Sequence, residues 1–174
     1  MTDRGALVAT ASQTIGPFFH FAVVDQRLGL MTERFSGGEP VRLSIRITDG
    51  NDEPVSDALV ELVQDGVFGR MAAGQDGTCE FKTVRPGTTA RKHGGADHAS
   101  HIDVCLFARG LLRQLHTRIY FAGDAALASD PTLTLVPTER RSSLIATPDP
   151  SGAEGAWVFH IRLQGSSETV FFDV

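Results

Sequence analysis

The sequence predicts an all-β domain, a two-sheet antiparallel β-sandwich with an N-terminal arm and one short helix. Residues 41–48, 115–121 and 157–164 each alternate apolar and polar side chains, which is the period of a half-buried strand. Clusters of glycine, proline, aspartate and asparagine follow such segments and can form turns, as at residues 49–52 and 85–87. Many short strands divided by turns are typical of a β-sandwich.

The segments between the predicted strands indicate one helix, loops and an arm. Residues 138–146 are the one credible helix, since Thr138 can cap the first turn and Glu139 suits the positive end of the helix dipole. Residues 88–100 and 148–155 have loop composition and are expected to be exposed. We divide the chain into an arm, residues 1–22, and one sandwich domain, residues 23–174.

Composition excludes several classes of function. The 174 residues favour a single domain, and 41% apolar with 21% charged residues is ordinary for a soluble globular protein. A net charge of -5 argues against nucleic acid as a partner. Cys79 and Cys105 lie in apolar strand-like segments, which predicts free thiols in a reducing compartment. No segment is apolar for long enough to cross a membrane, and we expect a cytoplasmic protein.

His98, His101 and Asp103 are the residues best placed to bind a metal. His101 and Asp103 are two residues apart and would share one face of a strand, and two imidazoles with a carboxylate can form a facial triad for a divalent ion. The spacing is loose, however, and a histidine in a strand is more often a hydrogen-bonded core or interface residue. We therefore favour the interpretation without a metal.

Four motifs, in order along the chain, resemble those of the protocatechuate 3,4-dioxygenases, a family of intradiol ring-cleaving enzymes. The first is Ser-Gln-Thr-Ile-Gly-Pro-Phe-Phe-His at residues 12–20. The second is Phe-Lys-Thr-Val-Arg-Pro-Gly at residues 81–87. The third joins Leu-Phe-Ala-Arg-Gly at 106–110 to Leu-His-Thr-Arg-Ile-Tyr-Phe at 115–121, and the fourth is Glu-Thr-Val-Phe-Phe-Asp at 168–173. The resemblance spans nearly the whole chain and is closest to the family's α subunit.

The resemblance implies that this chain binds no metal. In this family the β subunit holds ferric iron on two tyrosines and two histidines arranged as His-x-His. The corresponding triplet here ends in an aspartate, Asp103; one ligand tyrosine is replaced by Thr89, and the other has no counterpart. Tyr120, the single tyrosine of the chain, matches a family position that is not a ligand. Ferric iron in such a site depends on anionic oxygens, so the resemblance implies that the iron is held by a partner β subunit.

The resemblance also implies a function, that of the α subunit shaping the substrate pocket of the iron-bearing β subunit. The reaction implied is intradiol cleavage of protocatechuate by O2 to 3-carboxy-cis,cis-muconate. The implied substrate-binding residues are Arg109, Gly16 and Pro17, and no catalytic residue is expected in this chain. The guanidinium of Arg109 offers a planar fork for a carboxylate, Gly16 permits close backbone approach, and Pro17 fixes the direction of the arm.

One alternative has no catalytic role. Residues 41–87 alone would equally suit a transthyretin-like β-sandwich that serves as a binding or scaffolding module, but such a module has no reason to carry the arm or the region around Arg109. The predicted strand at residues 102–108 is apolar on both faces, so its second face needs cover from a loop or from another subunit. We favour a partner subunit, with the arm contributing to that interface.

Overall fold

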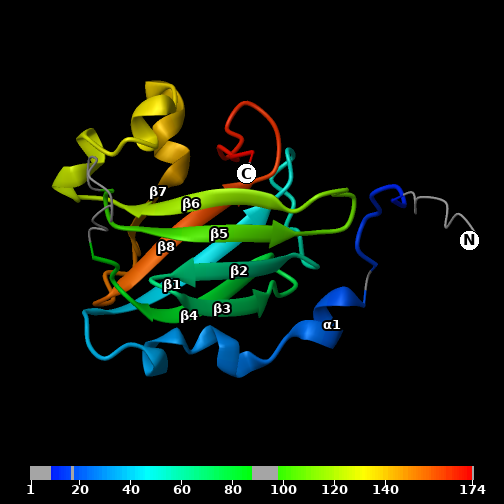
Figure 1. The fold of residues 1–174 in the computed structure, drawn as a ribbon, viewed down its shortest axis with the longest axis horizontal. Helices are drawn as coiled ribbons and strands as arrows, with labels where there is room; N and C mark the ends of the chain where they lie inside the picture. The colour runs from blue at the N-terminus through cyan, green and yellow to red at the C-terminus, as the bar shows by residue number, and fades with distance from the viewer. Residues whose placement is uncertain (1–8, 17, 88–97, 174) are drawn as a thin grey trace, which may run out of the picture.

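The computed structural model describes residues 9–16, 18–87 and 98–173, in which eight strands form one strongly curved sheet (Figure 1). The strand order across the sheet is β3-β2-β5-β6-β7-β8-β1-β4. The strands are β1 (Pro40–Thr48), β2 (Leu59–Gln64), β3 (Val67–Ala72), β4 (Thr78–Val84), β5 (His101–Phe107), β6 (Leu115–Phe121), β7 (Ile145–Pro148) and β8 (Ala156–Arg162).

The prediction of a mostly β fold is confirmed, but the prediction of two antiparallel sheets is wrong. The short strand β7 joins the two halves, because Tyr120 of β6 pairs with Ile145 in parallel while Thr147 pairs with Val158 of β8 in antiparallel. Strands β1 and β8 are also parallel. Alternation reports which face of a strand is buried and says nothing about its neighbours, so the connecting strand could not be seen in the sequence.

The two edge strands of the sheet, β3 and β4, approach each other, which makes the fold nearly a barrel (Figure 1). The 3-10 helices η1 (Gln26–Gly29) and η2 (Met31–Arg34) lie against both β3 and β4. Gly69 of β3 permits this packing, since a Cβ built there would lie 2.5 Å from the Met31 sulfur. A larger residue at position 69 would push η2 away from the sheet.

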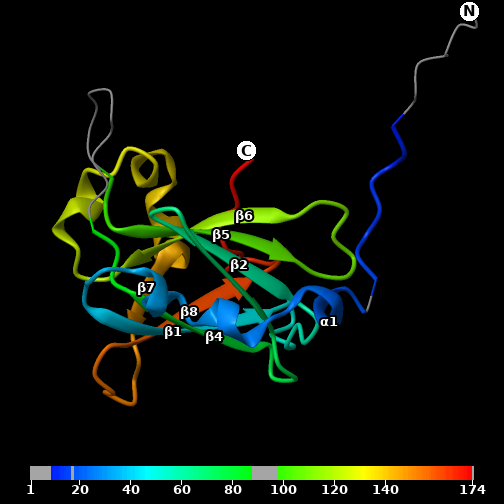
Figure 2. The same cartoon turned by 60° about the horizontal axis from the view of Figure 1, so that its bottom comes forward.

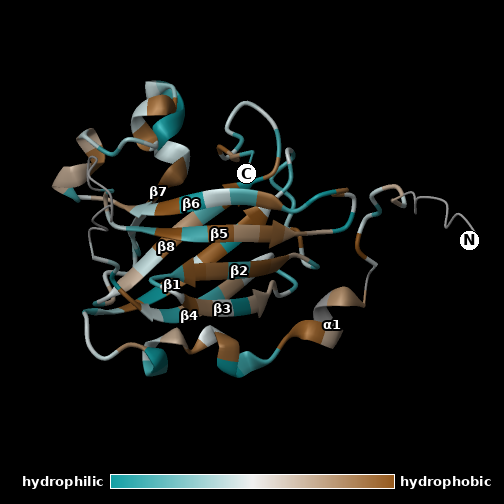
Figure 3. Ribbon diagram, viewed as in Figure 1, coloured by the Kyte–Doolittle hydropathy of each residue, from teal (hydrophilic) through white to brown (hydrophobic). Residues whose placement is uncertain are grey.

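The core lies inside the curve of the sheet, and the alternation of β1 is confirmed. Val41, Leu43, Ile45 and Ile47 are all buried, with exposed fractions of 2% or less. They pack in one cluster with inward side chains of the other half, such as Ile102, Val104 and Leu106 of β5. Hydrophobic residues are concentrated in the strands, above all in β2 and β5 (Figure 3). Each such side chain contributes about 1.5–3 kcal/mol when fully buried.

The predicted helix at residues 138–146 is wrong in type and length. The segment forms a 3-10 helix, η5 (Thr138–Leu144), whose N-cap is Pro137 with no side-chain cap bond. The next two residues belong to β7. Leu144 and Ala146 are buried in the core, and this packing outweighs local helix preference. The single α-helix of the described residues is α1 (Phe19–Val23), which overlaps the segment predicted as an arm. The remaining 3-10 helices are η3 (Ala125–Ala128) and η4 (Leu133–Leu135).

The loop and cysteine predictions have separate outcomes. Residues 88–97 of the predicted loop lie outside the described residues, while Ala99 and Ser100 are buried, contrary to expectation. Cys79 and Cys105 are free thiols, as predicted, and burial raises their pKa values to about 12 and about 11. Among the described residues, no helix combines the length and apolar character that a membrane span requires.

Candidate functional site at the end of β5

The arm and the end of β5 are joined by a hydrogen bond between residues that are 96 positions apart. The backbone N–H of Gly110 donates to Thr14 Oγ1 at 2.7 Å. Gly110 has a φ of 87°, a conformation that favours glycine and turns the chain just after Arg109. The two views agree that the arm passes beside the turn between β5 and β6 (Figures 1 and 2). Two motifs quoted from distant parts of the sequence therefore meet in space.

A second contact fixes the other side of the arm. The ring of Phe19 in α1 lies 5.9 Å from the ring of Phe107, the last residue of β5. The arm thus covers one end of the outer face of β5. Part of the cover that the sequence predicts for this apolar strand therefore comes from the chain itself. Gly16 lies between the two anchors and is exposed, and Pro17 lies outside the described residues. A cavity of about 140 Å³ separates the arm from the turn and is lined by Gln13, Ile15, Phe107, Ala108 and Leu111–Gln114.

Arg109 lies two residues after the end of β5, and its guanidinium is bound by an acidic side chain. Its Nε–H donates to Oδ2 of Asp57, a residue just before β2. The Arg109 side chain is 59% exposed, whereas that of Asp57 is 16% exposed. Within residues 9–16, 18–87 and 98–173, the two terminal nitrogens of Arg109 make no hydrogen bond. The guanidinium is therefore anchored through one edge and keeps its end-on fork available.

The structure does not bring His98, His101 and Asp103 together as a metal site. The rings of His98 and His101 are neighbours, with centroids 5.6 Å apart. His101 Nδ1 donates to the Ala99 carbonyl at 2.7 Å, and Asp103 pairs with Arg118 Nε at 2.9 Å. Among the described residues, no group of three or more histidine, cysteine, aspartate or glutamate side chains is arranged to hold a metal ion.

Asp130 is a fully buried carboxylate at the centre of a hydrogen-bond network. It accepts bonds from the hydroxyl of Tyr120 at 3.0 Å and from His98 Nδ1 at 3.1 Å. Backbone N–H groups of Ala99, Thr132 and Leu133 also donate to it. Burial alone would raise the pKa of Asp130, but these donors outweigh it, led by the Leu133 N–H, and the net pKa lies below the ordinary 3.8. The network ties the start of β5 to β6 and η4.

This network predicts a specific loss of stability in acid. Because the folded-state pKa of Asp130 is lowered, its contribution is complete above the ordinary pKa and disappears as the pH falls through the lowered value. The urea midpoint of the wild type should fall between about pH 5 and pH 2 more steeply than that of Asp130→Asn, which cannot titrate at this position. Parallel slopes for the two proteins would contradict this role.

Tyr120 is buried and is poorly suited to ligate iron. Burial raises its pKa to about 12, the nearby Arg118 opposes this shift, and the Asp130 carboxylate reinforces it. The hydroxyl is therefore protonated at neutral pH and donates to Asp130. A hydroxyl that is buried and donates to Asp130 cannot reach a metal ion without breaking this network.

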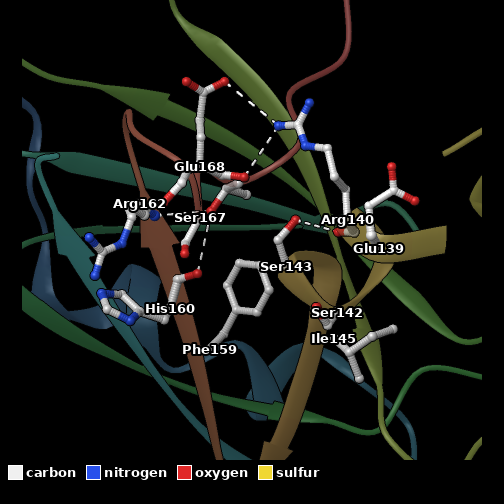
Figure 4. Close-up of a pocket in the computed structure, with 12 residues that line it drawn as sticks. Glu139, Arg140, Ser142, Ser143, Ile145, Phe159, His160, Arg162, Ser167 and Glu168 are labelled. Carbon is white, nitrogen blue, oxygen red and sulfur yellow. Dashed lines mark hydrogen bonds and ion pairs between the residues drawn. The ribbon is translucent and has the colours of Figure 1, made fainter. Parts of the chain in front are cut away.

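A larger cavity, of about 340 Å³, lies between η5, β8 and residues 166–169 (Figure 4). Its cationic side chains already have acidic partners. Arg140 Nη2 is 3.8 Å from Glu168 Oε1, and Arg162 donates to Asp52 at 2.8 Å. Burial lowers the pKa of His160, and the charge of the nearby Arg46 acts in the same direction. None of the residues lining this cavity belongs to the Arg109 region.

Sequence reasoning does not identify two carboxylates, Asp57 of the Arg109 region and Asp130 of the buried network. Asp57 lies in no motif, and nothing in the sequence pairs it with a residue 52 positions away. Asp130 precedes a proline and a threonine, an arrangement typical of a turn in which the aspartate accepts the N–H two residues later. That signal predicts a local turn, but it does not predict that the same carboxylate binds Tyr120 and His98.

Comparison with known proteins places the chain in a family. No protein-family model matches it. It is 38% identical to the protocatechuate 3,4-dioxygenase alpha chain of Burkholderia cepacia over 97% of this chain and 98% of that protein. The alpha chain of Pseudomonas putida is 35% identical over 96% of this chain and 97% of that protein. The chain belongs to the family of protocatechuate 3,4-dioxygenase alpha chains.

Other members and neighbours of the protocatechuate 3,4-dioxygenase family are more distant. The beta chain of Burkholderia cepacia is 30% identical over 76% of this chain and 67% of that protein. Hydroxyquinol 1,2-dioxygenase from Pseudomonas putida DLL-E4 has the same fold, with a TM-score of 0.63, 20% identity, and coverage of 91% of this chain and 68% of that one. Catechol 1,2-dioxygenase from Pseudomonas arvilla C-1 gives a TM-score of 0.60 at 21% identity, over 79% of this chain and 56% of that one.

Intradiol dioxygenases use ferric iron, and the described residues of this alpha-type chain do not fit that ion. Thr89, at the family position of one ligand tyrosine, lies outside the described residues. In the described part, the buried hydroxyl of Tyr120 is bonded to Asp130, and Asp103 is paired with Arg118. His101 Nδ1 is engaged by the Ala99 carbonyl, and the neighbouring His98 is bonded to Asp130. No step of a reaction can be assigned to a metal on this set of residues.

Proposed function

We propose that this chain is the α subunit of a protocatechuate 3,4-dioxygenase and that it shapes the substrate pocket of a β subunit that holds the ferric iron. The observation that carries the proposal is the similarity to two alpha chains over 96–97% of this chain. Matches of this extent favour the dioxygenase interpretation over a transthyretin-like module. The reaction of the assembled enzyme is the insertion of both atoms of O2 into protocatechuate, which gives 3-carboxy-cis,cis-muconate.

The proposed share of this chain in the reaction is orientation of the substrate. Arg109 binds the ring carboxylate through its two terminal nitrogens, an arrangement supported by the anchoring of its Nε on Asp57. Gly16 and Pro17 form part of the wall. A Cβ built on Gly16 meets no atom within 4 Å, so the space beside it is open to a partner or a substrate. Holding the carboxylate in one place favours a productive geometry and reduces contact with bulk water.

The arm and the turn after Arg109 are proposed to form part of the interface with the β subunit. Phe18 is 74% exposed and Leu112 is 61% exposed, and both lie close in sequence to residues proposed for the pocket. Large apolar side chains at this level of exposure are typical of association surfaces when they are grouped. The two free thiols are in keeping with a cytoplasmic location.

Iron content and colour of separately and jointly expressed subunits test the proposal. We expect the chain alone to be colourless, inactive and free of stoichiometric iron. With the β subunit it should form a burgundy complex that cleaves protocatechuate and contains one iron per αβ pair. Tyr120→Phe is the matched control, since it removes the single tyrosine of this chain and should leave the colour of the complex unchanged. Stoichiometric iron bound to the isolated chain would contradict the proposal.

A further inference from the structure

The environment of Asp57 is unusual for an acidic residue near a protein surface. Its side chain is only 16% exposed, and among the described residues its carboxylate has one partner, the Nε–H of Arg109. A largely buried carboxylate is stable only when it is paired. Asp57 is followed by Ala58 and by Leu59 of β2, both of which are buried, so its backbone is fixed by the core.

The arginine has the opposite character. Arg109 follows the buried Ala108, and its long, flexible side chain is 59% exposed. An exposed arginine normally samples many rotamers, and fixing such a side chain when a ligand binds has an entropic cost. A partner that fixes the guanidinium beforehand removes part of that cost.

The position at which Asp57 binds the guanidinium determines which nitrogens of Arg109 remain available to bind a ligand. Asp57 binds at Nε, which leaves the Nη1 and Nη2 nitrogens side by side at the exposed end. Two parallel N–H groups match the two oxygens of a carboxylate. We propose that Asp57 is a positioning residue that holds Arg109 in this orientation and so sets the selectivity of the assembled enzyme for catechols that carry a carboxylate; this inference rests on the proposed function.

A competing effect has the opposite sign. Asp57 also brings a negative charge close to the place proposed for the substrate carboxylate, and repulsion between the two would weaken binding. Orientation predicts that neutralising Asp57 raises KM for protocatechuate, whereas repulsion predicts that it lowers KM. The two effects are therefore distinguished by the direction of a single measurement.

The test uses the αβ enzyme with Asp57→Asn in this chain and compares protocatechuate with unsubstituted catechol. We expect KM for protocatechuate to rise about tenfold, with kcat within twofold of the wild type and with no change in KM for catechol. Asp57→Glu, which restores the negative charge, should recover most of the loss. A KM for protocatechuate that is unchanged or lowered in Asp57→Asn would overturn the inference.

Three controls make the outcome specific. Asp52→Asn removes the same charge from another Asp–Arg pair, that with Arg162, and should leave both KM values unchanged. The double variant Asp57→Asn/Arg109→Ala should have the same KM as Arg109→Ala, because Asp57 acts through Arg109. If Arg109→Ala raises KM for protocatechuate and Asp57→Asn does not, Asp57 has no positioning role and the proposed function stands. If neither raises it, the proposed role of Arg109 fails and this inference fails with it.

Discussion

Replacing Arg109 by alanine is expected to raise KM of the αβ enzyme for protocatechuate by about 10- to 150-fold. This range corresponds to the loss of about 1.5–3 kcal/mol that is typical of a hydrogen bond between charged groups. KM for catechol should change by less than threefold, because catechol has no carboxylate to bind the two terminal nitrogens of Arg109. Steady-state kinetics with both substrates measures the ratio directly, and kcat at saturation should remain close to that of the wild type.

Two variants show whether the effect belongs to the guanidinium. Arg109→Lys keeps the positive charge but loses the planar fork, and it should recover only part of the selectivity. Arg27→Ala removes an exposed arginine that also pairs with an aspartate, Asp25, but lies outside this region, and it should behave like the wild type with both substrates. An equal loss of activity toward protocatechuate and catechol in Arg109→Ala would show that the residue supports assembly and does not bind the carboxylate.

Replacing Asp130 by alanine is expected to lower the free energy of unfolding by about 3–5 kcal/mol. The substitution leaves the buried hydroxyl of Tyr120 and the backbone N–H of Ala99 and Leu133 without their acceptor. Each unsatisfied buried polar group costs about 1–3 kcal/mol, and loss of a buried charged partner gives effects of the stated size. Urea unfolding at pH 7, followed by far-UV circular dichroism, measures the change.

Asp103→Ala is the matched control for that experiment. Asp103 lies in β5, whose start is tied to Asp130. It also has a charged partner, Arg118, but its side chain is 54% exposed. Exposed ion pairs contribute about 0–1 kcal/mol, so this variant should remain within about 1 kcal/mol of the wild type. Similar losses for Asp130→Ala and Asp103→Ala would show that burial of the Asp130 carboxylate is not the source of its effect.

The strands were predictable from the sequence wherever one face meets the core. Alternation at residues 41–48 and 115–121 corresponds to β1 and β6, since side chains there point in turn to the core and to solvent. The strand that joins the halves was not predictable. β7 has four residues, too few for a period, and it is defined by its pairing with Tyr120 and Val158, which lie in distant parts of the sequence.

The candidate site was predictable only in part. The family resemblance predicts that the motifs around Gly16 and Arg109 contribute to one substrate pocket, and the hydrogen bond from Gly110 to Thr14 brings these segments together. Asp57 could not be identified, because an acidic residue before a strand has no distinguishing pattern until its partner is known. Pairings of this kind depend on how the sheet curves, and a sequence pattern with a period of two or three residues contains no information about that curvature.

The parallel pairing of β1 with β8 has a consequence for how the chain is made. On the ribosome β1 emerges early and can pair with β4 as soon as that strand has been made, but its other edge stays open until β8, more than a hundred residues after β1, has been synthesised. Until then a strand with four large apolar side chains presents unpaired N–H and C=O groups, an arrangement prone to wrong association. The newly made chain is therefore most vulnerable to aggregation just before its last strand appears, and chaperones or slow release would matter most at that moment.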